Sequence, residues 1–283
     1  MSDHKTDDKT DDKGEDRYTV PALARGLQLL MSFNRDEREL TGAELSRRLD
    51  LPRASVFRML QTLEQGGFVE RVGDGASYKL GLSVLRLGFE YLASMELTEH
   101  GRPVIEDLRD LCGYSAHVVV RDNRDVVFVA KAAGRSAMFH SIQVGARLPA
   151  HATVLGRVLL GDLSLAELRE LYPEEHLEQH SPSTPSTVMA LFDMVQADRQ
   201  RGFVSGEGFF EPSISTVAAP VRDQSGSTFA ALGVTIPTIQ VGHINYNELL
   251  LQVRRSADEL SRLLNYNSAA HDGQPRVTAL MRD

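Results

Sequence analysis

Hydrophobic residues recur at helical spacing in three short segments near the amino terminus. The first helix is predicted over 21–33 and the second over 41–49, which opens with the Thr-x-x-Glu pattern of a capping box. A tight turn over 50–53 separates the second helix from the third, because Pro52 lacks the amide that a continuing helix needs. The third helix is predicted over 53–65.

Two short alternating segments follow the third helix. Residues 68–72 and 77–80 alternate between apolar and polar side chains, and the Gly-Asp-Gly sequence at 73–75 is typical of a tight turn. Three helices followed by a hairpin, with a short turn between the second and third helices, form the pattern of a winged helix–turn–helix. We therefore predict a DNA-binding domain over 18–81.

The rest of the chain predicts a second, larger domain over 97–268, joined to the first by a linker helix over 82–96. Its predicted helices are at 98–112, 152–161, 164–171, 187–201 and 249–264, and its predicted strands at 116–120, 126–130, 203–210, 216–222 and 229–236. Strands joined by turns, with helices at both ends, imply an antiparallel sheet flanked by helices, so the predicted fold class is α+β in two domains. Residues 1–17 and 269–283 are predicted to be a disordered and a flexible tail.

The sequence points to a cytoplasmic protein. No window approaches the roughly 18 to 20 uninterrupted apolar residues of a membrane span, and the amino terminus lacks the pattern of a secretory signal. The single cysteine, Cys112, cannot form an internal disulfide. Its neighbours indicate a buried residue at a helix end, although the alternative of a redox sensor is open.

The distribution of charge matters more than its total. The net charge of −8, from 31 basic and 39 acidic residues, would ordinarily argue against a nucleic-acid partner. Within residues 47–58, however, four arginines face one aspartate, which gives a local charge of +3. Such a cluster is often only a solvated helix face, so its meaning depends on the helix–turn–helix pattern around it.

The third helix is the element that a helix–turn–helix places in the major groove. Arg53, Ser55 and Arg58 near its amino end are the candidates for contacts with base edges. Four further cations are predicted to meet phosphates and fix the register: Arg47, Arg48, Arg71 and Lys79. The alternative is a winged helix that binds protein through a solvated basic face.

Residues 18–268 resemble the IclR family of bacterial transcriptional regulators. The resemblance rests on several segments in this order, each weak alone: LTGAELSRRLDLPRASVFRMLQTLEQGGFVER (40–71), YKLGLSVLRLG (78–88), GARLPAHATVLGRVLL (145–160), RGFVSGE (201–207) and VAAPVRDQSGSTFAALGVTIP (217–237). It implies a homodimer or dimer of dimers, a winged helix on operator DNA, and a GAF-like domain that binds a small effector, often a carboxylic acid or an aromatic compound.

The resemblance also implies a set of effector-binding positions. Carried onto this chain, they are Leu148, Val154, Leu155, Gly206, Thr216, Gly233 and Thr235, together with Met138 and Phe139. Gly206 stands where many members have Asp, and Thr216 where Cys is common. Gly233 and Thr235 stand where Ser is frequent. The loss of a carboxylate and the two glycines predict a wider, more neutral cavity, which favours an apolar or aromatic ligand with one or two polar groups.

Three histidines are further candidates for a binding site. His117 lies in an alternating strand, where a structural role is the simpler interpretation. His140 and His151 flank the 145–149 loop and could help backbone amides at the start of the 152–161 helix to hold an anionic ligand. The nine histidines lack metal-ligand spacing, so neither a metal nor a cofactor is expected.

The sequence as a whole favours a ligand-responsive, sequence-specific DNA-binding regulator of a catabolic operon. Glu207 and Glu211 could be interpreted as a catalytic pair, but the chain has no nucleophile elbow, phosphate loop or dinucleotide fingerprint, so an enzyme is not expected. The rival hypothesis is a small-molecule enzyme or sensor that uses its winged helix only for protein docking or oligomerisation.

Overall fold

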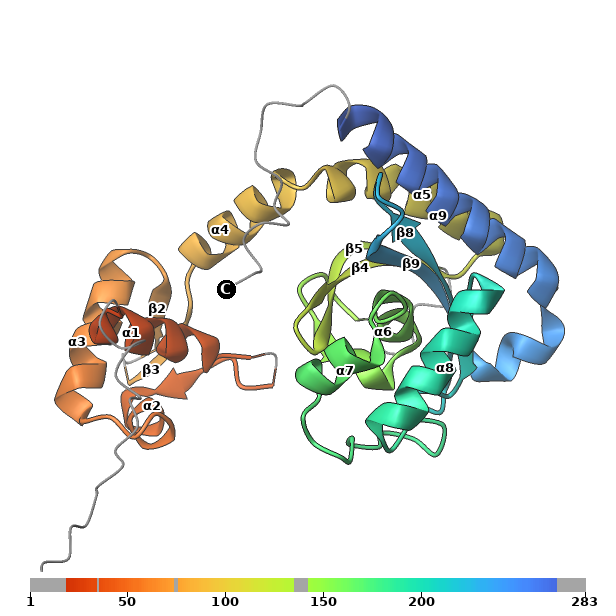
Figure 1. Cartoon of the computed structure of the whole chain (residues 1–283). Coiled ribbons are helices and arrows are strands. Elements are labelled where there is room, and N and C mark those ends of the chain that lie inside the picture. Colours follow the sequence, from red (N-terminus) through yellow and green to blue (C-terminus); the bar gives the residue numbers. More distant parts are fainter. Residues whose placement is uncertain (1–18, 35, 74–75, 135–141, 269–283) are drawn as a thin grey trace, which may run out of the picture. The chain divides into compact units, whose positions relative to one another are not determined.

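The computed structural model describes residues 19–34, 36–73, 76–134 and 142–268. Contacts divide the chain into two compact units, with the division between Tyr91 and Leu92. The two predicted tails lie outside the described residues, as do Met138, Phe139 and His140. Each unit is described by itself (Figure 1).

The first unit confirms the winged helix–turn–helix. Its elements are α1 (Pro21–Met31), β1 (Leu40–Thr41), α2 (Gly42–Arg48), α3 (Arg53–Gln65), β2 (Val69–Val72), β3 (Ser77–Leu80) and the greater part of α4 (Leu82–Ala93). The hairpin β2–β3 is antiparallel, and β1, which the pattern did not predict, adds to its β3 edge. The small core is built from α1 and the turn after it, β1, α2, α3 and the two hairpin strands, without α4: Leu29, Phe33, Leu40, Leu45, Val56, Leu60, Val69 and Tyr78.

Local chemistry fixes the turn between α2 and α3. The capping box is present in full: Thr41 Oγ1 accepts a hydrogen bond from the Glu44 amide, and the Glu44 carboxylate accepts one from the Thr41 amide. Asp50 takes a positive φ of 50°, and Ser46 Oγ donates to the Leu51 carbonyl. These contacts close the turn tightly enough for α3 to begin at Arg53, as predicted.

The second unit is built on one six-stranded sheet. Its strands are β4 (Ser115–Asp122), β5 (Asp125–Ala132), β6 (Arg147–Pro149), β7 (Val204–Glu207), β8 (Ile214–Arg222) and β9 (Thr228–Pro237), in the order β6-β5-β4-β9-β8-β7 with every neighbour antiparallel. Its helices are α5 (Glu96–Cys112), α6 (Val154–Leu159), α7 (Leu165–Leu171), α8 (Val188–Arg201) and α9 (Tyr246–Ser268), with 3₁₀ turns at Ala150–Ala152 and Thr238–His243.

The two faces of this sheet carry separate hydrophobic cores. Helices α5 and α9 lie side by side on one face, and α6, α7 and α8 cover the other (Figure 1). Strand β8 shows the division, since Val217 and Ala219 pack toward α5 and α9 whereas Ala218 packs toward α6. This alternation is the period-two pattern expected of a strand that is buried on both sides.

Several predicted boundaries were wrong. Thr98 is not the N-cap of α5, which begins at Glu96; Thr98 Oγ1 instead donates to the carbonyls of Leu92 and Met95. The strand predicted over 203–210 ends at Glu207, because Gly208 turns the chain with a φ of 57°. The helix predicted over 152–161 is a 3₁₀ turn followed by six residues of α6, with Thr153 as the cap between them.

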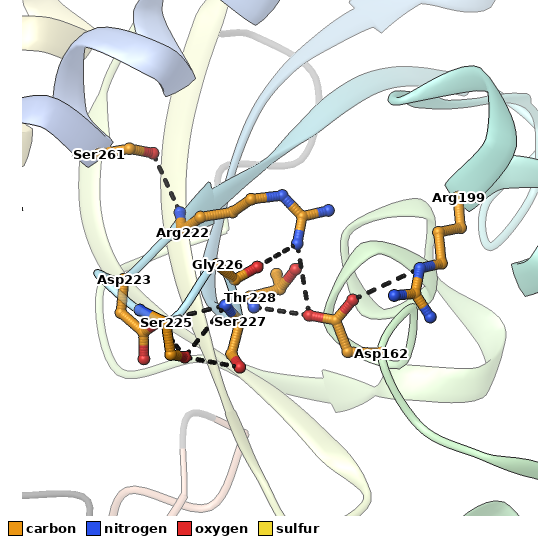
Figure 2. Close-up of polar contacts among 9 residues, drawn as sticks. All are labelled: Asp162, Arg199, Arg222, Asp223, Ser225, Gly226, Ser227, Thr228 and Ser261. Atoms are coloured by element: carbon orange, nitrogen blue, oxygen red, sulfur yellow. Dashed lines mark hydrogen bonds and ion pairs between the residues drawn. The ribbon is translucent and has the colours of Figure 1, made fainter.

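A polar network fastens the carboxyl end of α6 (Figure 2). The Asp162 carboxylate accepts a hydrogen bond from the Thr228 amide at 2.6 Å and pairs with Arg222 at 3.5 Å and with Arg199 at 3.8 Å. Burial acts to raise the pKa of Asp162, but the hydrogen bonds from Thr228 and the two arginines outweigh it and lower the pKa. Asp162 therefore stays ionised and holds α8 and the β8–β9 turn together.

Within the described residues, no helix is long and apolar enough to cross a membrane. Cys112 is the last residue of α5, where it is partly buried, and burial raises the pKa of its thiol. A raised pKa keeps the thiol protonated and unreactive near neutral pH, which supports the structural role expected of Cys112.

Candidate functional site

Helix α3 presents the predicted base-contacting residues to solvent. Arg53 and Arg58 are exposed, and Ser55 is partly exposed, while Val56 and Leu60 hold the opposite side of the helix in the core. Ala54, one turn before Arg58, is also exposed and adds no bulk. The exposed face can therefore approach a groove closely with its two arginines extended.

Three of the four cations predicted to meet phosphates form ion pairs with carboxylates, whereas the two arginines predicted to contact bases do not. Arg48 makes a two-pronged ion pair with Glu37, Arg71 bonds Glu64 at 3.0 Å, and Lys79 lies 3.3 Å from Glu70: three pairs, all exposed. Within the part of the chain that the structure describes, Arg47, Arg53 and Arg58 have no ion-pair partner. Exposed pairs are weak, so phosphates can replace these carboxylates at small cost.

The ion pair with Arg48 also lowers the pKa of Glu37. The hydrogen bonds from Arg48 and Asn34 hold the pKa of Glu37 at about 2, so this exposed carboxylate is ionised at every physiological pH. The charge of the DNA-facing unit is therefore partly balanced before DNA arrives. The two α3 arginines, like Arg47, carry a charge that no ion pair among the described residues balances.

In the second unit, strand register gathers polar side chains on the α6 face of the sheet. One row of opposed residues runs Gly206, Thr216, Thr235 and Ser115 across β7, β8, β9 and β4. The next row runs Ala218, Gly233, His117 and Lys131 across β8, β9, β4 and β5. Five side chains of these two rows form the floor of a cavity: Ser115, His117, Lys131, Thr216 and Thr235.

A β-bulge places Lys131 in the second row. The register between β4 and β5 shifts by one residue between Val118 and Val119, which leaves Val129 as the extra residue on β5. Phe128 precedes the bulge and faces α6, whereas strict alternation from Phe128 would turn Lys131 to the opposite face. Because of the bulge, Lys131 lies directly opposite His117 and lines the cavity.

The cavity has a polar floor and an aromatic and aliphatic wall. Its polar lining is Ser115, His117, Lys131, Thr153, Glu211, Thr216 and Thr235, and its apolar lining is Phe128, Ile142, Leu148, Val154, Leu155, Phe209, Phe210 and Ile214. Five of the effector-binding positions that the resemblance implies therefore line it: Leu148, Val154, Leu155, Thr216 and Thr235. The prediction of a more neutral cavity did not include the two charged side chains of the lining, Lys131 and Glu211, or its three phenylalanines.

Gly206 and Gly233 do not line the cavity. A Cβ at Gly206 would lie 2.8 Å from Val154 Cγ2, and one at Gly233 would lie 2.9 Å from both Leu155 Cδ2 and the Val217 carbonyl oxygen. The space left by each glycine is filled by a side chain from the first turn of α6. The prediction that they widen the cavity was thus wrong, and a leucine at 233 would disrupt the packing of α6 rather than fill the ligand space.

The buried ring of His117 lines the cavity. Its Nε2 lies 3.2 Å from Thr235 Oγ1, and its ring meets Phe128 edge to face at 5.4 Å. Burial, with a smaller effect of Lys131, lowers the pKa of His117 to about 3, so the imidazole is neutral. Its Nδ1 is buried without a hydrogen-bond partner among the described residues.

A buried ion pair stands behind the cavity wall. The Arg157 guanidinium on α6 lies 4.7 Å from the centre of the Phe209 ring and bonds the buried Asp198 carboxylate on α8 through Nε at 2.8 Å. The Phe209 carbonyl accepts hydrogen bonds from Ser181 Oγ and Thr184 Oγ1. Phe209 is therefore held through both its ring and its backbone carbonyl.

Of the other polar candidates that the structure describes, only Glu211 lines the cavity. His151 Nε2 is 2.9 Å from the Glu178 carbonyl oxygen and its ring packs against Tyr172, so it does not line the cavity. At the start of α6, Thr153 Oγ1 accepts a hydrogen bond from the Gly156 amide, so this amide is already used within the helix cap. Glu211 lines the cavity, but Glu207 does not. No cluster of metal-ligating residues occurs among the described side chains.

A winged helix with free arginines on its recognition helix, followed by a sheet domain with a built ligand cavity, defines a ligand-responsive transcriptional regulator. Comparison with family models agrees: residues 22–73 match the IclR helix-turn-helix domain, and residues 89–262 match the bacterial transcriptional regulator IclR C-terminal domain. The chain belongs to the IclR family.

Named relatives and solved structures are similar over most of their length. The Pca regulon regulatory protein of Pseudomonas putida is 32% identical over 81% of this chain and 78% of its own. The HTH-type transcriptional regulator XynR of Escherichia coli is 26% identical over 87% and 98%. A transcriptional regulator from Rhodococcus sp. RHA1 is 31% identical, with a TM-score of 0.76 over 88% of this chain and 100% of that structure.

The lowered pKa of His117 makes the second unit sensitive to acid. Below about pH 6.5 the unfolded chain binds a proton at His117 that the folded protein does not bind until about pH 3, so the free energy of unfolding falls as the pH falls through this range. We expect a loss of about 2 kcal/mol at pH 5 relative to pH 7 from this residue.

Urea unfolding at pH 5 and pH 7, with wild type and His117→Gln compared, measures this loss. Glutamine can keep a bond to Thr235 but does not titrate, so the variant should show a smaller difference between the two pH values. The same pH dependence in both proteins would show that His117 is not held neutral.

Proposed function

We propose that this protein is a dimeric regulator of a catabolic operon whose effector is a small aromatic carboxylate. The observation that carries the effector class is the pairing of one cation, Lys131, with the aromatic wall of Phe128, Phe209 and Phe210. A half-buried ammonium group attracts a carboxylate strongly, and aromatic rings bind a flat apolar body. The protein acts by binding rather than by catalysis, as the regulator names of its relatives support.

The unpartnered Nδ1 of His117 supports an effector with a second polar group. A buried nitrogen without a hydrogen bond is costly, and a hydroxyl group on the ligand would satisfy it. Thr216 and Thr235 beside it add two more hydroxyls to the cavity floor. An IclR homologue from Microbacterium hydrocarbonoxydans, 23% identical with a TM-score of 0.75, was solved in complex with 4-hydroxybenzoate, and we choose this compound as the first probe.

Replacing Lys131 by Met should remove the preference for an acid. We expect the affinity for 4-hydroxybenzoate to fall about 10- to 100-fold, because a hydrogen bond to a charged group contributes about 1.5–3 kcal/mol. The affinity for the uncharged 4-hydroxybenzyl alcohol should stay within about twofold. Isothermal titration with both compounds measures the two affinities.

The matched control for this titration is Thr216→Val, which keeps the shape of the cavity and its charge. This substitution should lower the affinity for both compounds by a similar small factor. An equal loss for the acid and the alcohol in Lys131→Met would contradict the proposed role of Lys131, and tight binding of pyruvate or glyoxylate to wild type would contradict the aromatic effector.

The free and paired cations of the first unit should differ in what they recognise. Arg53→Ala or Arg58→Ala should cost about 1–3 kcal/mol on the cognate operator and relax its sequence preference, because each removes a base contact. Lys79→Ala should weaken every sequence alike and lower the salt dependence, because Lys79 would meet a phosphate. Gel shifts on operator and scrambled duplex at several salt concentrations measure both effects.

The behaviour of the wild-type protein in the same gel shifts distinguishes a DNA-binding regulator from an enzyme or sensor. An enzyme or sensor that uses its winged helix only for docking would give no specific retardation. A uniform loss for all three variants on both duplexes would contradict the assignment of base contacts.

Unpartnered apolar side chains support the dimer. Helix α4 has no buried residue in this chain, and Leu82, Leu87 and Phe89 are more than half exposed. On α1, Leu23 and Met31 are likewise exposed. Apolar faces of this extent mark contacts with another protein, and two copies would present two α3 helices to a partial palindrome.

We therefore expect light scattering to give at least a dimer at micromolar concentration, and Phe89→Glu to shift it toward the monomer. Met189→Glu, at an apolar side chain of the second unit that is about half exposed, is the control and should leave the mass unchanged. A monomeric wild type whose footprint covers one half-site would contradict the dimer.

A further inference from the structure

Phe57 is an aromatic side chain on the DNA-facing helix that the assigned contacts leave unused. It is 50% exposed, and it is the one exposed large hydrophobic residue of α3, all of whose residues the structure describes. The core is served by Val56 and Leu60 on the neighbouring side of the helix. Phe57 therefore contributes little to folding for its size, and its exposure calls for another explanation.

The position of Phe57 along α3 gives that explanation. Residues four apart lie in a row along a helix, so Arg53, Phe57 and Gln61 form one exposed row beside Ala54 and Arg58. Both arginines are without ion-pair partners among the described residues, and Gln61 is exposed. Phe57 thus stands between side chains that suit guanine and adenine, on a helix that enters the major groove.

We propose that Phe57 reads thymine, through contact between its ring and the C5-methyl group in the major groove. The methyl group is the one apolar feature that a base pair presents there, and a rigid aromatic ring is a suitable partner for it. The inference rests on the proposed reading of bases by α3. It adds an apolar contact to a site whose other candidates are polar.

Helix geometry also fixes where the thymine should lie. Phe57 is four residues from Arg53, which is about 6 Å along the helix axis. Since base pairs are spaced by about 3.4 Å, the thymine should lie within about two base pairs of the guanine that Arg53 contacts. This spacing ties the two contacts to one short stretch of each half-site.

Deoxyuridine tests the contact directly, because it pairs like thymidine and lacks only the methyl group. An operator is first enriched in vitro with the full-length wild-type protein, and each thymine is then replaced in turn by deoxyuridine. Fluorescence anisotropy gives the affinity of wild type and of Phe57→Ala for every duplex. At one or two thymines in each half-site, the substitution should lower the affinity of wild type about fourfold, which is the value for one buried methyl group.

At the same thymines, the affinity of Phe57→Ala should be unchanged when thymine is replaced by deoxyuridine. Phe57→Leu, which keeps an apolar side chain, should retain part of the loss. Gln65→Ala, an exposed change at the end of the same helix, is the matched control and should respond to deoxyuridine as wild type does. Since Phe57 is half exposed, the variants should fold, and circular dichroism and thermal melting check this.

Three results would overturn the proposal. The first is an equal loss of affinity on deoxyuridine substitution in wild type and Phe57→Ala. The second is a wild-type affinity that no deoxyuridine substitution changes. The third is a set of sensitive thymines that lie far from the guanine contacted by Arg53. A wild-type protein that enriches no sequence would instead contradict sequence-specific DNA binding itself, and the proposal with it.

Discussion

The close seating of α6 on the sheet is the constraint on which the ligand cavity depends. Gly156 allows this helix to touch the preceding turn, since a Cβ there would lie 2.0 Å from the Ala150 carbonyl oxygen. Gly206 and Gly233 make room on the sheet for Val154 and Leu155. The first turn of α6 thereby closes the cavity above the polar floor, and a larger residue at any of the three glycines would lift it.

Polar contacts then hold α6 along its length. Thr153 caps its start, Arg157 ties its middle to α8 through the buried Asp198, and Asp162 fastens its end to the β8–β9 turn. A buried charge that loses its partner costs about 3–5 kcal/mol, so these ties resist distortion. A ligand that bears on Phe209 or Val154 therefore acts on elements linked to the whole α6 face of the sheet, which is a physical basis for a response to effector.

The first unit could be predicted almost entirely from the sequence, because its elements are set by local chemistry. The capping box at Thr41, the turn at Pro52 and the glycines at the end of α3 each act over a few residues, and α3 begins and ends where predicted. The structure added the pairing of charges there. Arg48, Arg71 and Lys79 are held by carboxylates that are distant in sequence or across the hairpin, which no count of basic residues could reveal.

For the second unit, the sequence by itself determined the class of domain, the positions of five of its six strands along the chain and, through the family resemblance, five of the residues that line the cavity. Tertiary structure decided the rest of the site, because strand register brings Thr216, Thr235 and His117 together. The clearest case is Lys131. Periodicity assigns it to the α5 and α9 face, and the extra residue Val129 turns it into the cavity. A bulge depends on how two strands pair, so the alternation of one strand cannot disclose it.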